Sequence, residues 1–393
     1  MTDNCKGFVA QWTESGKKLS SLISLLKNRM SFLLHEISDE KAVYTVFEVL
    51  NSRGLEVSWF DRLKSILMGA AFEIRGADNR QLVAELHALW RDIYNIIGLR
   101  QGLSNEALRF AATLWVDEAP SRPLGEEDSV DVFRKEAVTA KQILKVAKWI
   151  LEVTKACDKV TADNRLSAVT RISQARLLAV ALYLNKKLSG AERKTLLESW
   201  EKVSFKIYGM LEKDARFRVG DYVRLAWKVT NEKPSTKSID AEIKGIGAEF
   251  TAEEAVECLR GANCYEGWEN ELRYFFFRYE EYLSNSKGLN FKNEQWRKIW
   301  MESPSKSIEH IWPKSKAPDD VKHNLGNLML LPPNLNAKLQ AISPKEKKEP
   351  YRQTGLLLAD EVCTAIDKKR WSKKAIRERE SDLLKWALEE WGD

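Results

Sequence analysis

Ser307-Ile-Glu-His-Ile-Trp-Pro313 is the first of three short segments that define the local structure near the C-terminus. It is followed by His323-Asn-Leu-Gly-Asn-Leu-Met-Leu-Leu-Pro332 and then by Asn334-Leu-Asn-Ala-Lys338. Side chains alternate between the two faces of a strand, so the first segment predicts a short strand with Glu309 and His310 on opposite faces. The apolar run 328–331 predicts a second short strand, because two prolines follow it at once. Asn334 can cap a helix after those prolines, and the expected order is strand, loop, strand, helix.

The rest of the chain has the periodicity of helices. Apolar residues recur three or four positions apart in 82–97, 143–151 and 172–182, whereas strand-like alternation is scarce. Polar breaks at 231–238 and 284–288 predict loops. The fold class expected is mainly α, in several domains, with the small strand and helix unit near the C-terminus.

The composition restricts the class of protein. A chain of 393 residues is long enough for two or three domains. Its 44% hydrophobic and 31% charged residues are typical of a soluble globular protein, and it contains no apolar stretch of the length that crosses a membrane. Five scattered cysteines and the absence of a secretory pattern at the start make a disulfide scaffold unlikely, so we expect a cytoplasmic protein.

The net charge of +6 is concentrated in one part of the chain. From residue 286 to 393 there are 21 Lys and Arg against 16 Asp and Glu, which accounts for most of the excess. A basic region of this kind is compatible with a partner that carries phosphates, but it is equally compatible with a solvated surface of mixed charge.

The three C-terminal segments resemble the HNH, or ββα-metal, nucleases. In that family a short strand carries a metal ligand followed directly by a histidine that acts as general base. A later asparagine holds the connecting loop, and a residue on the helix completes the metal site. The resemblance implies that Glu309 and Asn336 are metal ligands. It implies that His310 is the general base and that Asn327 is the central asparagine that orients it.

The same resemblance implies a mechanism and a cofactor. A neutral His310 would take a proton from the water that attacks the phosphorus, and one Mg²⁺ or Mn²⁺ ion would stabilise the charge on the phosphate. His323 is a candidate for contact with phosphate or metal, or for a hydrogen bond within the loop. Lys338 is a candidate nucleic-acid contact, or an ordinary solvated lysine. A purely structural ββα unit is the alternative for the whole motif.

A wider resemblance is to GmrSD-type restriction proteins, a modification-dependent (type IV) anti-phage class. The motifs Glu-His-Ile-x-Pro and His-x-Leu-Gly-Asn-Leu are similar to those of the family's C-terminal nuclease domain. Trp371-Ser-Lys-Lys-Ala-Ile-Arg-Glu-Arg379, followed by an apolar helical pattern to Trp391, is similar to the way that domain ends. The resemblance implies an endonuclease that cuts modified DNA.

A second similarity lies near the N-terminus. Val46-Phe-Glu-Val-Leu-Asn-Ser-Arg-Gly-Leu55 and Asp61-Arg-Leu-Lys64 resemble the later part of the family's ParB/sulfiredoxin-like domain, which is associated with NTP. This implies nucleotide contacts for Glu48, Asn51 and Arg53; a helix-turn-helix packing corner is the alternative. The family's Asp-Gly-Gln-Gln-Arg signature is not found before residue 46. We therefore expect NTP binding only together with a partner chain that supplies this loop.

These observations predict three regions and one leading function. Residues 1–70 are expected to be a remnant of the ParB-like domain, 71–285 a helical middle region, and 286–393 the HNH nuclease domain. The leading hypothesis is a metal-dependent DNA endonuclease of an anti-phage restriction system that acts on modified DNA. The alternatives are a regulatory or DNA-binding subunit of a split restriction complex, and a nuclease that acts on RNA.

Overall fold

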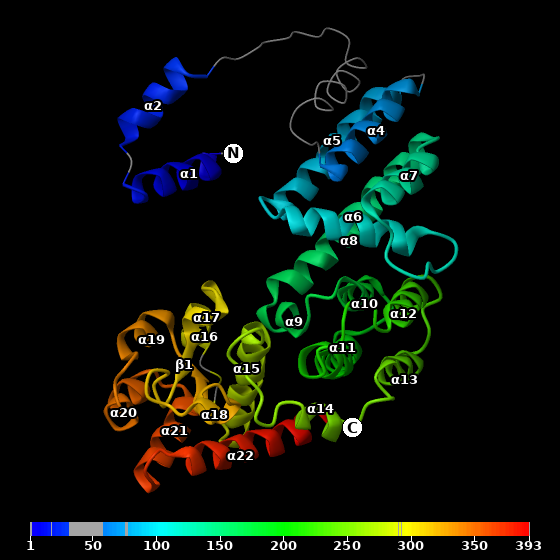
Figure 1. Ribbon diagram of the computed structural model, residues 1–393. Helices are drawn as coiled ribbons and strands as arrows, with labels where there is room; N and C mark the ends of the chain where they lie inside the picture. Colours follow the sequence, from blue (N-terminus) through cyan, green and yellow to red (C-terminus); the bar gives the residue numbers. More distant parts are fainter. Residues whose placement is uncertain are drawn as a thin grey trace.

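The computed structural model describes residues 2–16, 18–30, 58–74, 78–289, 291 and 293–392 (Figure 1). Helices account for most of this part of the chain, and its only sheet there has two strands, which confirms the mainly α fold class. No helix among the described residues is both long enough and apolar enough to pass through a membrane.

The first group of helices precedes residue 140. Its members are α1 (Thr2–Glu14), α2 (Leu19–Asn28), α4 (Trp59–Glu73), α5 (Asp78–Ile97), α6 (Gln101–Trp115) and α7 (Glu126–Glu136). The middle group consists of α8 (Ala140–Ala162), α9 (Asn164–Val169), α10 (Ser173–Leu184), α11 (Gly190–Ser204), the π-helix η1 (Phe205–Met210), α12 (Val219–Asn231) and α13 (Thr236–Ile246).

The third group contains the sheet. It consists of α14 (Ala252–Glu257), α15 (Glu269–Ser286), α16 (Asn293–Met301), α17 (Pro304–Ser307), β1 (Ile308–His310), α18 (Asp319–Lys322), the 3-10 helix η2 (Leu325–Asn327), β2 (Leu328–Leu330), α19 (Pro333–Leu339), α20 (Pro344–Gln353), α21 (Leu357–Lys368) and α22 (Lys373–Trp391). Figure 1 shows α15 to α22 gathered around β1.

The helices form where the apolar periodicity predicts them. The three patterns 82–97, 143–151 and 172–182 fall in α5, α8 and α10, and α8 packs against both of the others. Their apolar faces are buried, as the fully enclosed Trp90 of α5 and Ile150 of α8 illustrate. The loop expected at 231–238 is shorter than predicted, since only 232–235 separate α12 from α13, and α15 ends within the break expected at 284–288.

Local polar residues determine several helix starts. Thr139 with Gln142, Ser189 with Glu192 and Ser343 with Glu346 each form a capping box, in which two side chains bond to the free amides of the first turn. The residue at which α20 begins is therefore determined by its own sequence, and this helix carries residues of the candidate site.

Candidate active site

The strand β1, which pairs with the antiparallel strand β2, carries the expected metal ligand Glu309 and the expected base His310. Ile308 pairs with Leu330, Glu309 with Met329 and His310 with Leu328. The helix α19 begins at Pro333, soon after β2, so the expected order of strand, loop, strand and helix is observed, but Asn334 lies within the first turn and is not the N-cap. All three residues of each strand are buried, which places Glu309 and His310 inside the domain rather than on an open face.

Asn327 holds the loop that connects the two strands. Its side-chain oxygen accepts hydrogen bonds from the Trp312 amide at 2.8 Å and from the Trp371 indole at 3.3 Å. Its side-chain nitrogen donates to the carbonyls of Trp312 and Lys322, at 3.1 and 2.9 Å. Its own carbonyl accepts from the Ile311 amide at 2.9 Å. Asn327 therefore acts on the backbone that follows His310, and among the described residues it forms no hydrogen bond to the imidazole.

Glu309, His310 and Asn336 line one cavity of about 530 Å³. Asn336 reaches it from α19, and its side-chain nitrogen donates to the carbonyls of Lys306 and Ile308 at 2.8 and 3.0 Å. Because only the NH₂ group can donate to carbonyls, these two bonds determine the orientation of the amide and leave its oxygen for another ligand. Glu309, His310 and Asn336 thus line the same cavity, although the first two lie on β1 and the third lies on α19.

The Glu309 carboxylate is held by two residues of α20. The Lys347 ammonium and the Tyr351 hydroxyl both donate to its Oε1 atom, at 2.5 and 2.7 Å. Lys347 also donates to the His310 carbonyl at 2.7 Å. Burial raises the pKa of Glu309 and lowers the pKa of Lys347, because the desolvation of each charge is larger than its stabilisation by the other.

His310 and His323 form a contact with Tyr265. The His310 Nε2 and His323 Nδ1 atoms are 3.0 Å apart, so one ring donates and the other accepts. The Tyr265 ring is stacked on His323 and meets His310 edge-on. Burial, His323 and the nearby Lys314 lower the pKa of His310 to about 3. The less buried His323 also has a lowered pKa, with burial as the main cause. His310 is therefore unprotonated at neutral pH.

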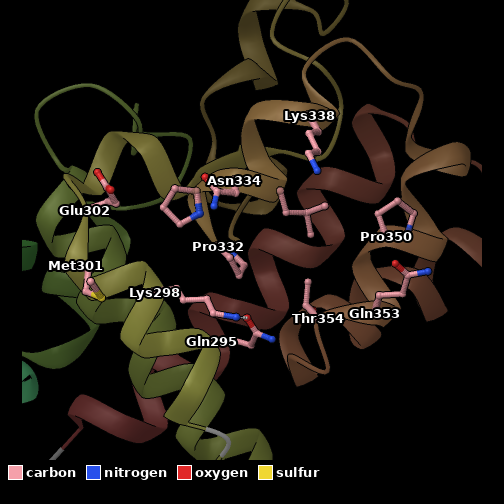
Figure 2. Close-up of a pocket in the computed structure, with 12 residues that line it drawn as sticks. Gln295, Lys298, Met301, Glu302, Pro332, Asn334, Lys338, Pro350, Gln353 and Thr354 are labelled. Atoms are coloured by element: carbon pink, nitrogen blue, oxygen red, sulfur yellow. Dashed lines mark hydrogen bonds between the residues drawn. The ribbon is translucent and has the colours of Figure 1, made fainter. Parts of the chain in front are cut away.

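Lys338 lies away from this cavity. It lines a different hollow of about 460 Å³, together with Lys298, Asn334 and Pro350 (Figure 2). A separation of two residues in a helix corresponds to a rotation of about 200°, so Asn336 and Lys338 leave α19 on opposite sides. The structure does not bring Lys338 to the residues of the motif. Glu48, Asn51 and Arg53, the expected nucleotide contacts, lie outside the described residues.

The residues around the cavity are compatible with a hard divalent cation. In the described part of the chain, the Glu309 carboxylate accepts hydrogen bonds only at Oε1. Its Oε2 atom and the side-chain oxygen of Asn336 are therefore available to coordinate a cation. Oxygen ligands suit Mg²⁺ or Mn²⁺. The same described ranges contain no cluster of three or more His, Cys, Asp or Glu, so a cation held here would need further ligands from water or a substrate phosphate.

Three residues of the site were not identified by sequence reasoning. Lys347 and Tyr351 come from a lysine-rich helix in which nothing distinguishes a buried lysine from a solvated one. Tyr265 belongs to the loop between α14 and α15, which is held to the site by a hydrogen bond from the Cys264 amide to the His323 carbonyl at 3.0 Å. Lys347 and Tyr351 are four residues apart and therefore lie on one face of α20, and this spacing is the one local signal that relates them.

The residues of the candidate site lie within a segment that matches a known family. Residues 251–386 match the family described as GmrSD restriction endonucleases, C-terminal domain. This segment of the chain is therefore similar to the C-terminal domain of a family of restriction endonucleases. The match begins at residue 251, and it includes α14, Tyr265 and α15 as well as the ββα unit. No curated protein matches the chain.

Proposed function

We propose that this chain is a metal-dependent endonuclease of the HNH type, which cleaves modified DNA in an anti-phage restriction system. The observation that carries the proposal is the shared cavity of Glu309, His310 and Asn336. These residues come from two elements, and the imidazole of His310 shares the cavity with two residues that carry side-chain oxygen atoms. The family match to restriction endonucleases supports DNA as the substrate. The preference for modified DNA rests on the resemblance to modification-dependent restriction proteins.

In this proposal His310 is the general base. Because it is unprotonated, it accepts a proton from the water whose oxygen forms a bond to phosphorus, while the bond from phosphorus to the sugar oxygen breaks. His323 supports the imidazole through the contact at 3.0 Å. Lys314 lines the same cavity and supplies a positive charge for the phosphate. Glu309 and Asn336 hold the divalent cation, which when bound stabilises the negative charge that develops in the reaction.

A second candidate function has one specific observation in its favour. The Lys347 ammonium is bonded to the carboxylate that is proposed to bind the cation. A site in which an internal cation neutralises Glu309 is compatible with a DNA-binding or regulatory subunit whose cleavage depends on a partner chain. A nucleotide enters either proposal only through such a partner.

The test is a cleavage assay with the full chain. Plasmid DNA, glucosylated phage DNA and RNA are incubated with Mg²⁺, with Mn²⁺ or with EDTA. His310→Ala is compared with His87→Ala, a matched change at an exposed histidine of α5. Cutting of DNA that requires the cation, and that is lost in His310→Ala but kept in His87→Ala, is the expected result. If wild type and both variants bind DNA without cutting it, the endonuclease proposal is wrong and the DNA-binding or regulatory subunit is favoured.

A further inference from the structure

A second, strongly basic cavity lies beside the candidate active site. Its volume is about 770 Å³, and it is formed by the loop after β1, the start of α20 and the end of α21 with the residues that follow. Six cationic side chains line it against the single anion Asp367, and they are Lys316, Lys345, Lys348, Lys368, Lys369 and Arg370. The cavity of His310 has one lysine and one glutamate by comparison. The positive charge of the C-terminal region is thus concentrated here.

Three of these cations are free to bind a ligand. Lys345, Lys368 and Arg370 are exposed, and no residue in the described ranges forms an ion pair with them. The others are engaged within the protein. Asp367 accepts from Lys348, and Lys316 donates to the Ala341 carbonyl at 2.9 Å. Exposed cations without a partner are the groups that exchange solvent counterions for phosphates.

One loop separates the basic cavity from the candidate active site. Lys314 and Ser315 line the cavity of His310, whereas Pro313 and Lys316 line the basic cavity. Asn327 holds this loop in place on the side of the basic cavity, because its oxygen accepts from the amide of Trp312 and from the indole of Trp371, which both form walls of that cavity. A polymer that places one phosphate at His310 therefore meets these cations as it continues across the loop.

We propose that the basic cavity binds the DNA backbone next to the phosphate that is cut. The choice of DNA rests on the proposed endonuclease function, and the site itself rests on the charge and on the shared loop. A nucleoside triphosphate is disfavoured because the capping box of α20 already engages two of the amides at its start, those of Ser343 and Glu346. Side-chain cations remain as the donors, and they bind phosphates without reading the sequence.

The test measures binding with the metal chelated, so that it does not depend on cleavage. Fluorescence anisotropy with a labelled DNA duplex is recorded over a range of salt concentrations for the full chain and for Lys345→Gln/Lys368→Gln/Arg370→Gln. The slope of log affinity against log salt should decrease by about three, since each lost phosphate contact removes about one unit. The affinity near 0.1 M salt should fall by about tenfold or more.

The matched control replaces three exposed lysines of the middle region that form no ion pair with a described residue. The control Lys187→Gln/Lys202→Gln/Lys237→Gln should bind as wild type does. A cavity variant with the wild-type slope overturns the proposal. It is also overturned if the cavity residues bind an RNA duplex more tightly than DNA, or if UTP or ATP binds to them and displaces the duplex. Because the chelator prevents cleavage, the anisotropy assay reports this site alone, so a failure of the proposed cleavage and a failure of this site give different results.

Discussion

The Lys347 ammonium lies 2.5 Å from Glu309 Oε1, and it also donates to the carbonyl of His310. Glu309 is 3% exposed and Lys347 is completely buried. One lysine therefore fixes the orientation of the acidic residue and the backbone of the histidine beside it. This contact joins α20 to β1, two elements that the sequence gives no reason to place together.

Removal of this lysine should destabilise the protein strongly. Lys347→Met leaves the Glu309 carboxylate buried without its cation, which should lower the free energy of unfolding by about 3–5 kcal/mol. Thermal and urea denaturation measure the change. The double variant Lys347→Met/Glu309→Gln should recover part of it. Lys306→Met, which breaks an exposed pair with Glu302, should cost less than about 1 kcal/mol. Equal melting temperatures for Lys347→Met and wild type would contradict the buried pair.

The side chain of Asn327 should be needed for both stability and cleavage. Asn327→Ala leaves the amide of Trp312 and two carbonyls without partners, at a cost of about 2–4 kcal/mol. Cleavage should fall as well, because the loop after His310 loses its fixed position. Asn327→Asp should be no better, since an oxygen would then face two carbonyls. The control is Asn334→Ala, an exposed position of α19 that should leave both measurements unchanged.

Close packing of η2 on α22 should make Gly326 irreplaceable. A Cβ atom there would lie 2.0 Å from the carbonyl oxygen of Ile376 and 2.9 Å from the amide of Glu380, and backbone atoms cannot move aside as a flexible side chain does. Gly326→Ala should therefore separate α22 from the ββα unit and lower the melting temperature markedly. Gly245→Ala in α13 meets nothing within 4 Å and should stabilise slightly, by up to about 1 kcal/mol. Similar melting curves for the two variants would refute the close approach.

The stability of the protein should depend on pH through Glu280. Its carboxylate accepts from the amides of Leu357 and Leu358, but burial raises its pKa to about 7. A raised pKa means that the folded state binds the proton more tightly, so this contribution is complete below about pH 4.5 and is lost as the pH rises to about 7.

Between these pH values the free energy of unfolding should fall by about 3 kcal/mol, and the Glu280→Gln variant should not show this fall. Denaturation of both proteins from pH 4.5 to 8 measures the difference between them, which removes the effect of other titrating groups. A difference that does not change over this range would show that Glu280 titrates normally.

Tyr265 should act through the position of the two histidines. Its ring is stacked on His323 at a centroid distance of 5.0 Å and meets His310 at 4.6 Å. Tyr265→Ala should lower kcat for DNA cleavage by about 10- to 100-fold, as the loss of a supporting residue typically does, with a smaller effect on KM. Tyr265→Phe keeps the ring and should retain activity. Equal loss in both variants would instead indicate a role for the hydroxyl.

Much of the fold could be predicted because its signals are local. The helical periodicity of 82–97 and 143–151, the polar break at 231–238 and the prolines after β2 act over a few residues of chain, and the elements appear where these signals lie. The proximity of Glu309 to His310 follows from their adjacency, and the role of Asn327 in holding the loop followed from the resemblance. The roles of Glu48, Asn51 and Arg53 stay predictions, as do the three domain boundaries and the identity of the metal.

By itself the sequence determined the order of strand, loop, strand and helix. It also determined that Glu309 and His310 are consecutive residues of one strand. Backbone geometry, alternation and proline suffice for that. Only the tertiary structure decided that Lys347 neutralises the acid, that Tyr265 covers the imidazoles and that Lys338 faces away. The physical reason is that desolvation and ring contacts depend on residues far apart in the chain, which meet only when the helices pack.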